Sequence, residues 1–313
     1  MIIWLVAAGV ALAPIALGGR IARRLATASW THRSPRAALA LWQAICLAGG
    51  LGAVGVGLVA AVAPLAAVFP HGAHTLARQI VSGDGLDGLG GLHVAALAWS
   101  VGLIVWLLVH TTRVTVKTVR RQRRQRLLVD VVADHCAVHD AYVLPTHERV
   151  AYCLPGRRGR VVLSQGTLDL LSAHELEAVL GHERAHARGR HDLVLLPFIA
   201  LAQAFPWLPA ARAARETVPL LLEMIADDHA RRAHGEVVLA QTLVRMATPR
   251  FDDGARMFAL ADAAVAERVG RLLRHHERPP WVPAAAYAAA TLLLSGPSAV
   301  LVAPLLCVTI WNI

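Results

Sequence analysis

Four stretches of this chain contain no Asp, Glu, Lys or Arg: residues 2–18, 37–69, 91–109 and 281–313. A helix that crosses a bilayer needs about 20 apolar residues, and each stretch approaches or exceeds that length. The mean hydropathy of +0.50 is too high for an ordinary soluble protein. We therefore predict a mainly α integral membrane protein with about four transmembrane helices.

Two of these stretches depart from the ideal length of a span. The first is as short as a signal peptide, but no basic leader precedes it, so we interpret it as a span. Residues 37–69 would form a helix of about 50 Å, which exceeds the ~30 Å hydrocarbon core. We expect tilt, or a break near Gly49–Gly50 or Pro64, to absorb the excess.

Basic residues concentrate in three of the segments that flank the apolar stretches. Segments 19–36 and 111–126 carry five and seven of them, whereas segment 70–90 carries only Arg78. The third basic group consists of Arg268, Arg271, Arg274 and Arg278. Because basic loops stay in the cytoplasm, we expect a multi-pass protein of the cell membrane with a cytoplasmic central block and both termini outside.

This layout divides the chain into a three-span region at 1–110, a cytoplasmic domain at 111–280 and a C-terminal transmembrane helix at 281–313. The basic run at 120–126 would also suit nucleic acid, but beside a span such a run is usually a topology signal that meets anionic lipid. We expect the lipid bilayer as a partner and no direct nucleic acid. The four cysteines lack Cys-x-x-Cys spacing, which is typical of reduced thiols.

The central block combines strand and helix signals, as an α+β domain would. Short apolar runs at 150–154 and 160–164 flank a turn with proline and glycine, and they predict a β-hairpin. Ser172 and Glu175 form an S-x-x-E capping box. Together with apolar residues at helical spacing, this box predicts a helix over 173–188 that a glycine ends.

Residues 193–209 are apolar but short, and they contain three prolines. A crossing here would place the preceding and following helices on opposite sides of the bilayer. We interpret the segment as a membrane-dipping hairpin or a buried connection rather than a span.

The helix predicted over 173–188 carries the sequence HERAH. His182 and His186 are four residues apart, so they share one helix face and both imidazoles can reach one metal ion. Glu183 lies beside the first histidine, where its carboxylate can take a proton from an attacking water. The alternative is a pair of solvated histidines on a polar helix face.

Catalytic zinc usually takes a third protein ligand, and a helix predicted over 218–234 offers candidates. Thr217 or Pro219 is predicted to start this helix and Gly235 to end it. Its polar residues include Glu223, Asp227, Asp228 and His229. Two carboxylates on one face of an otherwise apolar helix are costly to bury without a cation. The alternative is a solvated acidic face.

Residues 171–192 read LSAHELEAVLGHERAHARGRHD and resemble the BlaR/MecR-type membrane metallopeptidases, family fifty-six of that class. They are also similar to the related family forty-eight, which includes HtpX and the CAAX prenyl proteases. Both families are gluzincins, whose third ligand is the glutamate of a downstream Glu-x-x-x-Asp pattern, and residues 223–227 match it. The resemblance covers roughly 127–275. Three spans, a protease block and a fourth span favour the BlaR/MecR type.

The resemblance implies an α+β gluzincin metalloprotease domain inserted among the spans. It implies that His182, His186 and Glu223 hold Zn²⁺. Glu183 would be the general base, which accepts the water proton and later passes it to the leaving amine.

Further roles follow from the same resemblance. Asp227 and Asp192 would orient the ligand imidazoles by accepting their second N–H. Arg268 matches the late arginine of these families and would be a catalytic residue. For stabilising the oxyanion, Arg268, His229 and His191 all stay candidates.

We expect a zinc metalloendopeptidase that cuts a cytoplasmic protein in regulatory signalling, with a BlaI-like transcriptional repressor as its substrate. One alternative is a quality-control protease that clips membrane proteins. Another is a non-enzymatic zinc-binding signalling receptor, in which Glu183 would have no role. An exposed edge of the strand at 160–164 would pair with an extended substrate. The oligomeric state stays open, a homo-oligomer included.

In one respect the sequence departs from the BlaR/MecR pattern. Those receptors continue into a penicillin-binding sensor, for which this sequence offers no counterpart after the last apolar stretch. The sensor's Ser-x-x-Lys nucleophile is missing, because the only lysine is Lys117 and Val114 stands three residues before it. We expect no direct β-lactam sensing.

Overall fold

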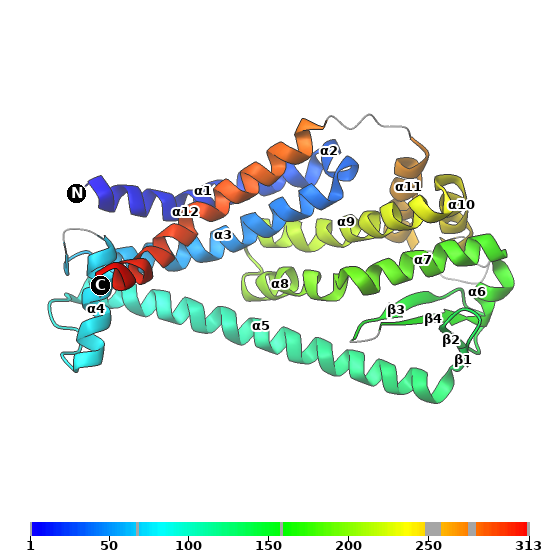
Figure 1. The fold of residues 1–313 in the computed structure, drawn as a ribbon, viewed down its shortest axis with the longest axis horizontal. Helices are drawn as coiled ribbons and strands as arrows, with labels where there is room; N and C mark the ends of the chain where they lie inside the picture. The colour runs from blue at the N-terminus through cyan, green and yellow to red at the C-terminus, as the bar shows by residue number, and fades with distance from the viewer. Residues whose placement is uncertain (1, 67–68, 157–158, 248–257, 275–279, 312–313) are drawn as a thin grey trace.

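The computed structural model describes residues 2–66, 69–156, 159–247, 258–274 and 280–311. The described chain is mostly helical and elongated, with long helices gathered toward one end and a small sheet among shorter helices at the other (Figure 1). Arg157 and Arg158 of the predicted hairpin turn, and Arg278 of the third basic group, lie outside the described residues.

In the described part of the chain, four helices are long and apolar enough to cross a membrane. They are α1 (Ile2–Thr27), α3 (Pro35–Val62), α5 (Gly91–Val132) and α12 (Trp281–Trp311), which we call the span helices. Helix α3 packs against the other three. The four helices correspond to the four predicted apolar stretches, and both termini lie at the end away from the sheet (Figure 1).

Two shorter helices lie at opposite ends of the span helices. Helix α2 (Ser29–Arg33) links α1 to α3 at the end that faces the sheet. Helix α4 (Phe69–Ser82) follows α3 at the other end, near the two termini (Figure 1). The segment 70–90, which the sequence leaves as a loop, is therefore helical over much of its length.

Helix α3 runs without a break through Gly49–Gly50 and ends at Val62, two residues before Pro64. The expected break near the proline is confirmed, and the glycine pair does not interrupt the helix. Gly57 allows α5 to approach closely, since a Cβ at this position would lie 2.3 Å from Ser100 Oγ. Small residues allow such approaches between helices in membranes.

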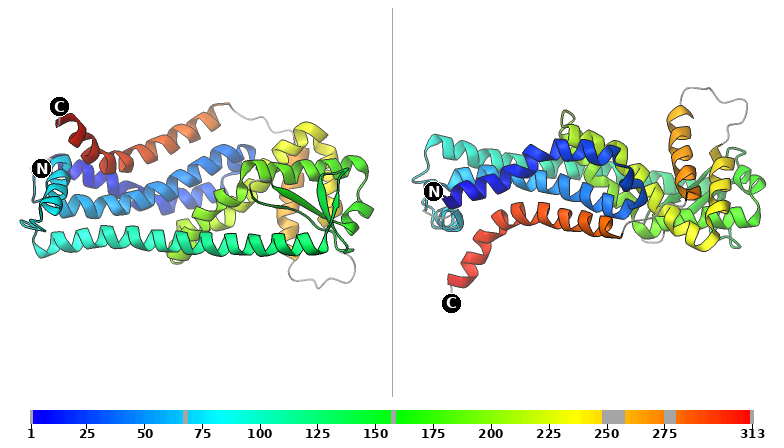
Figure 2. Two further views of the ribbon diagram at one scale, coloured as in Figure 1. Left: turned by 60° about the horizontal axis from the view of Figure 1, so that its bottom comes forward. Right: turned by 90° about the horizontal axis from the view of Figure 1, so that it is seen from above.

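Helix α5 has 42 residues, so it continues far beyond a span and crosses the predicted domain boundary at 110/111. In the left view of Figure 2 it runs along the molecule as one continuous rod, from the end with α4 to the sheet. Near its C-terminus, Arg126 Nη2 donates to the carbonyl oxygen of Leu154 at 3.4 Å. Asp130 accepts a hydrogen bond from Arg160. One continuous helix therefore connects the span helices to the sheet.

The sheet has four short strands in the order β1-β2-β4-β3. They are β1 (Asp134–Cys136), β2 (Ala141–Leu144), β3 (Ala151–Leu154) and β4 (Arg160–Ser164). Strands β3 and β4 pair antiparallel, which confirms the predicted hairpin. Strands β2 and β4 pair in parallel. Val161 and Leu163 of β4 pack against Leu176 and Leu180 in one buried cluster. This contact holds the sheet against the helix that carries the sequence HERAH.

Within the described residues, six further helices follow the sheet along the chain before α12. They are α6 (Gln165–Leu170), α7 (Ala173–Gly189), α8 (His191–Ala204), α9 (Pro209–His234), α10 (Glu236–Ala247) and α11 (Phe258–Leu273).

Helix α7 is the predicted motif helix, and its capping box is confirmed. The Ser172 N–H donates to Glu175 Oε2 at 2.9 Å, and Ser172 Oγ accepts from the Glu175 N–H. The left-handed residue that ends the helix is Arg190, with φ of 47°. Gly189 has a different role, because a Cβ there would lie 2.5 Å from Nε2 of His191.

The predicted start of the second helix at Thr217 or Pro219 is wrong. Helix α9 begins at Pro209, and Pro219 lies inside it. Pro219 has no N–H to donate to the preceding turn, yet its fully buried neighbours Val218 and Leu221 pack in the largest core cluster. This packing keeps the helix continuous at the position where the proline alone would predict a helix start. Gly235 follows the last residue, as predicted.

Helix α8 occupies most of the apolar segment 193–209 and turns back into α9. Its 14 residues span only about 21 Å, less than the ~30 Å core. Phe198 of α8 is buried in one cluster with Trp42 of α3, and Trp106 of α5 donates to the carbonyl oxygen of Ala204 at 3.3 Å. The segment is thus a helical hairpin packed against the span helices.

Candidate metal centre

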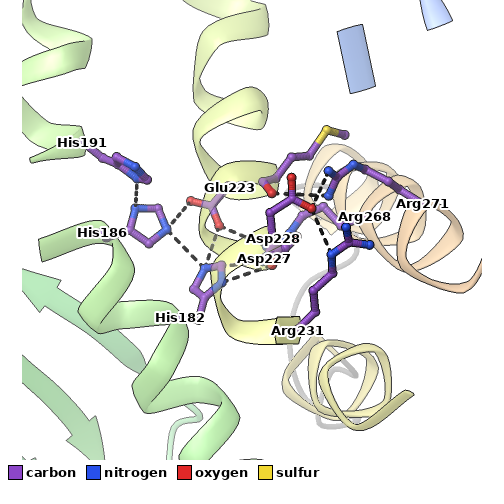
Figure 3. A network of polar contacts seen from close by, with 10 residues as sticks. His182, His186, His191, Glu223, Asp227, Asp228, Arg231, Arg268 and Arg271 are labelled. Atoms are coloured by element: carbon purple, nitrogen blue, oxygen red, sulfur yellow. Dashed lines mark hydrogen bonds and ion pairs between the residues drawn. The ribbon is translucent and has the colours of Figure 1, made fainter. Parts of the chain in front are cut away.

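His182 and His186 project from one face of α7 toward α9 (Figure 3). Their Nε2 atoms lie 3.2 Å apart. Only 9% of the His182 side chain and 20% of the His186 side chain are exposed. The spacing of four residues therefore produces the shared face that the sequence predicts, and that face is not solvated.

Glu223 of α9 faces both imidazoles (Figure 3). Its Oε2 lies 3.3 Å from Nε2 of His182, and its Oε1 lies 3.4 Å from Nε2 of His186. Burial opposes the charge of Glu223, but hydrogen bonds from the two histidines outweigh burial and hold the pKa of Glu223 below its usual range. Burial also lowers the pKa of His182, and contacts with the Asp227 and Glu223 carboxylates raise it to about 9.

These three side chains fit a zinc ion. Their donor atoms all lie within 4.8 Å of one another, and the contacts between them measure 3.2 Å, 3.3 Å and 3.4 Å. Tetrahedral zinc with bonds of about 2.0–2.1 Å keeps its ligand atoms about 3.3 Å apart. Two imidazoles and one carboxylate are also a donor set of catalytic zinc sites. Helices α7 and α9 therefore already hold the donors at the spacing that zinc requires.

Asp227 lies one turn beyond Glu223 on α9 and is fully buried. Its Oδ1 lies 3.1 Å from Nδ1 of His182, on the side of the ring opposite Nε2. Arg268 of α11 binds the same carboxylate through two hydrogen bonds, Nε to Oδ2 at 2.8 Å and Nη2 to Oδ1 at 2.7 Å. The contact between Asp227 and His182 is an ion pair rather than a well-aligned hydrogen bond. It fixes the ring with Nε2 toward Glu223.

Arg268 also reaches the candidate ligands directly, because its Nη1 lies 3.1 Å from Oε2 of Glu223. The structure thus brings the late arginine into the centre, as the resemblance implies. In the described arrangement its guanidinium is engaged by two carboxylates, so its visible role is to position Asp227 and Glu223 (Figure 3).

The outer nitrogen of His186 meets His191 instead of Asp192. Nδ1 of His191 lies 2.9 Å from Nδ1 of His186, and His191 is buried at the start of α8. Asp192 lines the same cleft, but its ion-pair contact is with Nε of Arg190 at 3.8 Å. The side chain that contacts the outer nitrogen of His186 is therefore His191, the residue before the predicted Asp192.

Two other residues of α9 stand apart from the centre. Asp228 accepts from Arg271 Nη2 at 2.7 Å and pairs with Arg231 Nε at 3.1 Å (Figure 3). His229 does not line the cleft; burial, followed by the charges of nearby arginines, lowers its pKa. Asp228 is therefore held by two arginines, and His229 contributes no side chain to the cleft at the metal centre.

A cleft of about 440 Å³ opens onto the three candidate ligands. Glu183 lines it, and burial raises the pKa of this carboxyl above its ordinary value. A raised pKa makes Glu183 a better proton acceptor near neutral pH. Apolar residues of α7 and α10 form another wall of the cleft: Val179, Leu239, Leu243 and Met246.

The sheet has two edge strands, β1 and β3, and the edge strand that lines the cleft is β3, not the predicted strand at 160–164. Strand β4 lies inside the sheet, because it pairs with β3 on one side and with β2 on the other. Ala151, Tyr152 and Cys153 of β3 line the cleft. An extended chain that adds to this sheet from the cleft would therefore pair with β3.

Sequence reasoning missed the contribution of α10 and of Cys153 to the cleft. The apolar spacing of α10 indicates a buried helix face but says nothing of what that face meets. Cys153 lies on a short strand whose edge position depends on the pairing of distant segments. No local signal marks either feature as part of a site.

Residues 119–248 match the model of peptidase family M48. The match runs from within α5 through α10 and covers less than half of the chain, so it includes the candidate ligands but not Arg268. No curated protein and no solved structure matches the chain. The matching family is the second of the two that the sequence resembles. It supports a metallopeptidase, and the BlaR/MecR assignment stays a prediction.

Proposed function

We propose that this protein is a membrane-inserted zinc endopeptidase of the gluzincin type. The observation that carries the proposal is the cluster of His182, His186 and Glu223, with Glu183 beside it in the same cleft. The match to a peptidase family over the same residues supports it. Four helices of span length support its insertion in a membrane.

Each residue of the centre has a task in peptide hydrolysis. Zinc, when held by these three side chains, supplies a Lewis acid that polarises the scissile carbonyl and makes water more acidic. Glu183 takes the proton of the attacking water and returns it to the leaving amine. Asp227 holds His182 in orientation, and Arg268 neutralises Asp227 while it contacts Glu223.

The walls of the cleft suit an extended polypeptide. As an edge strand, β3 offers backbone N–H and carbonyl groups, which bind a chain with little demand on its sequence. The apolar wall formed by Leu239, Leu243 and Met246 would take an apolar side chain near the scissile bond. We therefore propose that the substrate is an unfolded or extended protein segment.

Two kinds of substrate remain in competition. The order of three spans, protease domain and fourth span supports regulatory cleavage of a cytoplasmic repressor. The match to family M48, the family of HtpX, favours quality control of membrane proteins. Comparing new protein N-termini in cells with the wild type and with Glu183→Gln separates them. One soluble DNA-binding protein among the cut products supports regulation, whereas many membrane-protein fragments support quality control.

The proposed activity itself is tested on the purified full chain in lipid nanodiscs with fluorescent casein. We expect cleavage that 1,10-phenanthroline abolishes and that added Zn²⁺ restores, with about one zinc per chain by metal analysis. A zinc-loaded chain that cuts no unfolded protein would favour the non-enzymatic receptor instead.

A further inference from the structure

A second cleft, separate from the metal centre, lies between α2 and the first turns of α12. Its volume is about 520 Å³, and Ser29, Trp30, Arg33 and Ser34 form one wall. Trp281 and Ala285 belong to the opposite wall. None of its lining residues also lines the cleft at the metal centre.

The polar groups of this second cleft suit a phosphate. Arg33 is partly buried, and its Nη2 donates to Ser29 Oγ at 3.1 Å. Within the described part of the chain, no carboxylate contacts Arg33, so its charge is not neutralised by the protein. A guanidinium binds phosphate oxygens through paired N–H groups, and the hydroxyls of Ser29 and Ser34 can add donors.

The position of the cleft selects a lipid as the source of that phosphate. Helix α1 ends at Thr27, α3 begins at Pro35 and α12 begins at Trp281, so three span helices begin or end around it. Trp281 is 69% exposed, and tryptophan favours the level of lipid headgroups. A lipid whose phosphate is bound here would place its acyl chains beside the apolar outer face of α12, where Leu292 is 75% exposed.

The surrounding charge selects an anionic lipid over a zwitterionic one. Segment 19–36 carries five arginines and no acidic residue. A choline headgroup would bring a positive charge into this surrounding, whereas phosphatidylglycerol brings only its phosphate. We propose that the cleft between α2 and α12 binds the headgroup phosphate of an anionic phospholipid. This inference rests on the proposed membrane insertion and not on the peptidase activity.

The test is native mass spectrometry of the full chain in detergent, titrated with phosphatidylglycerol or with phosphatidylcholine. We expect the wild type to retain phosphatidylglycerol in preference to phosphatidylcholine. Arg33→Gln removes the cation and should weaken this retention roughly ten-fold, as loss of a charged hydrogen bond does. Ala285→Trp fills the cleft without a change of charge and should weaken it as well.

Arg24→Gln is the matched control, because it removes one charge from the same segment at an exposed residue outside the cleft. Retention by this variant should equal that of the wild type. An equal loss in Arg24→Gln and Arg33→Gln would show diffuse attraction to the basic segment and would overturn the proposal. So would equal retention of the two lipids, or displacement of phosphatidylglycerol by an equal concentration of inorganic phosphate. Thermal melting of each variant confirms that it is folded.

Discussion

His32 Nδ1 and Glu267 Oε1 lie 2.7 Å apart and join the connection between the first two span helices to helix α11. Arg271 of α11 strengthens this joint by donating to the carbonyl oxygen of His32. Arg268 follows Glu267 directly in sequence and holds Asp227 and Glu223 at the metal centre. Helix α11 therefore contacts α2 and the metal centre within two turns.

This joint predicts that Glu267→Gln lowers the turnover of a protein substrate while zinc content stays the same. The ion pair is partly exposed, so its loss should change the rate by only about two- to five-fold. Glu216→Gln removes an exposed carboxylate on another helix, α9, and should leave both turnover and zinc content unchanged. In a double-mutant cycle, His32→Gln should add no further loss to Glu267→Gln. Fully additive losses would show that the two residues act independently.

Glu183→Gln should keep zinc and lose activity, because the change removes the proton acceptor and leaves the three ligands in place. General-base loss typically costs about 10²–10⁴-fold in rate. Metal analysis and casein cleavage on the same preparation give the two readouts. Glu177→Gln, an exposed change on the same helix, is the control. Cleavage at the wild-type rate by Glu183→Gln would refute the mechanism.

Glu223→Ala should release zinc, whereas Asp228→Asn should retain it. The two carboxylates belong to the same helix, but only Glu223 faces both imidazoles, while Asp228 pairs with Arg271 and Arg231. Zinc content after dialysis decides the assignment. If Asp228→Asn released the metal and Glu223→Ala kept it, the third ligand would have to be assigned again.

His191→Ala should weaken zinc binding by about 10–100-fold, as the loss of a group that orients a metal ligand does. The reason is its contact of 2.9 Å with the outer nitrogen of His186. Asp192→Asn is the neighbouring control and should bind zinc nearly as well as the wild type. A competition titration with a zinc-binding dye measures both. A larger loss for Asp192→Asn would favour the role that the sequence resemblance gives to Asp192.

Structural features that depend on residues close together in the sequence could be predicted. The capping box of α7, the spacing of its two histidines and the β3–β4 hairpin depend on local signals, and the structure has them. The start of α9 could not be predicted, because burial of Val218 and Leu221 outweighs the local preference of Pro219 for a helix start.

Features that depend on distant pairing were also beyond the sequence. The parallel pairing of β2 with β4 puts β4 inside the sheet and leaves β3 at one edge, and no local pattern encodes that choice. The resemblance alone pointed to Arg268, since 40 residues separate it from Asp227 along the chain and only the fold of α11 against α9 brings them together. Likewise, the choice between His191 and Asp192 depends on how α8 leaves the left-handed Arg190.

The length of the continuous helix α5 sets the distance between the proposed membrane-spanning part and the sheet. With the proposed membrane insertion, 1.5 Å per residue and a hydrocarbon core of ~30 Å would leave roughly 20 Å of helix between the bilayer and Arg126, which is bonded to the end of β3. The free edge would then stand at a constant height above the lipid surface. An extended chain covers that height with about six residues. A substrate anchored in the same bilayer would therefore need a juxtamembrane tether of at least that length, and bonds closer to its own anchor would escape cleavage.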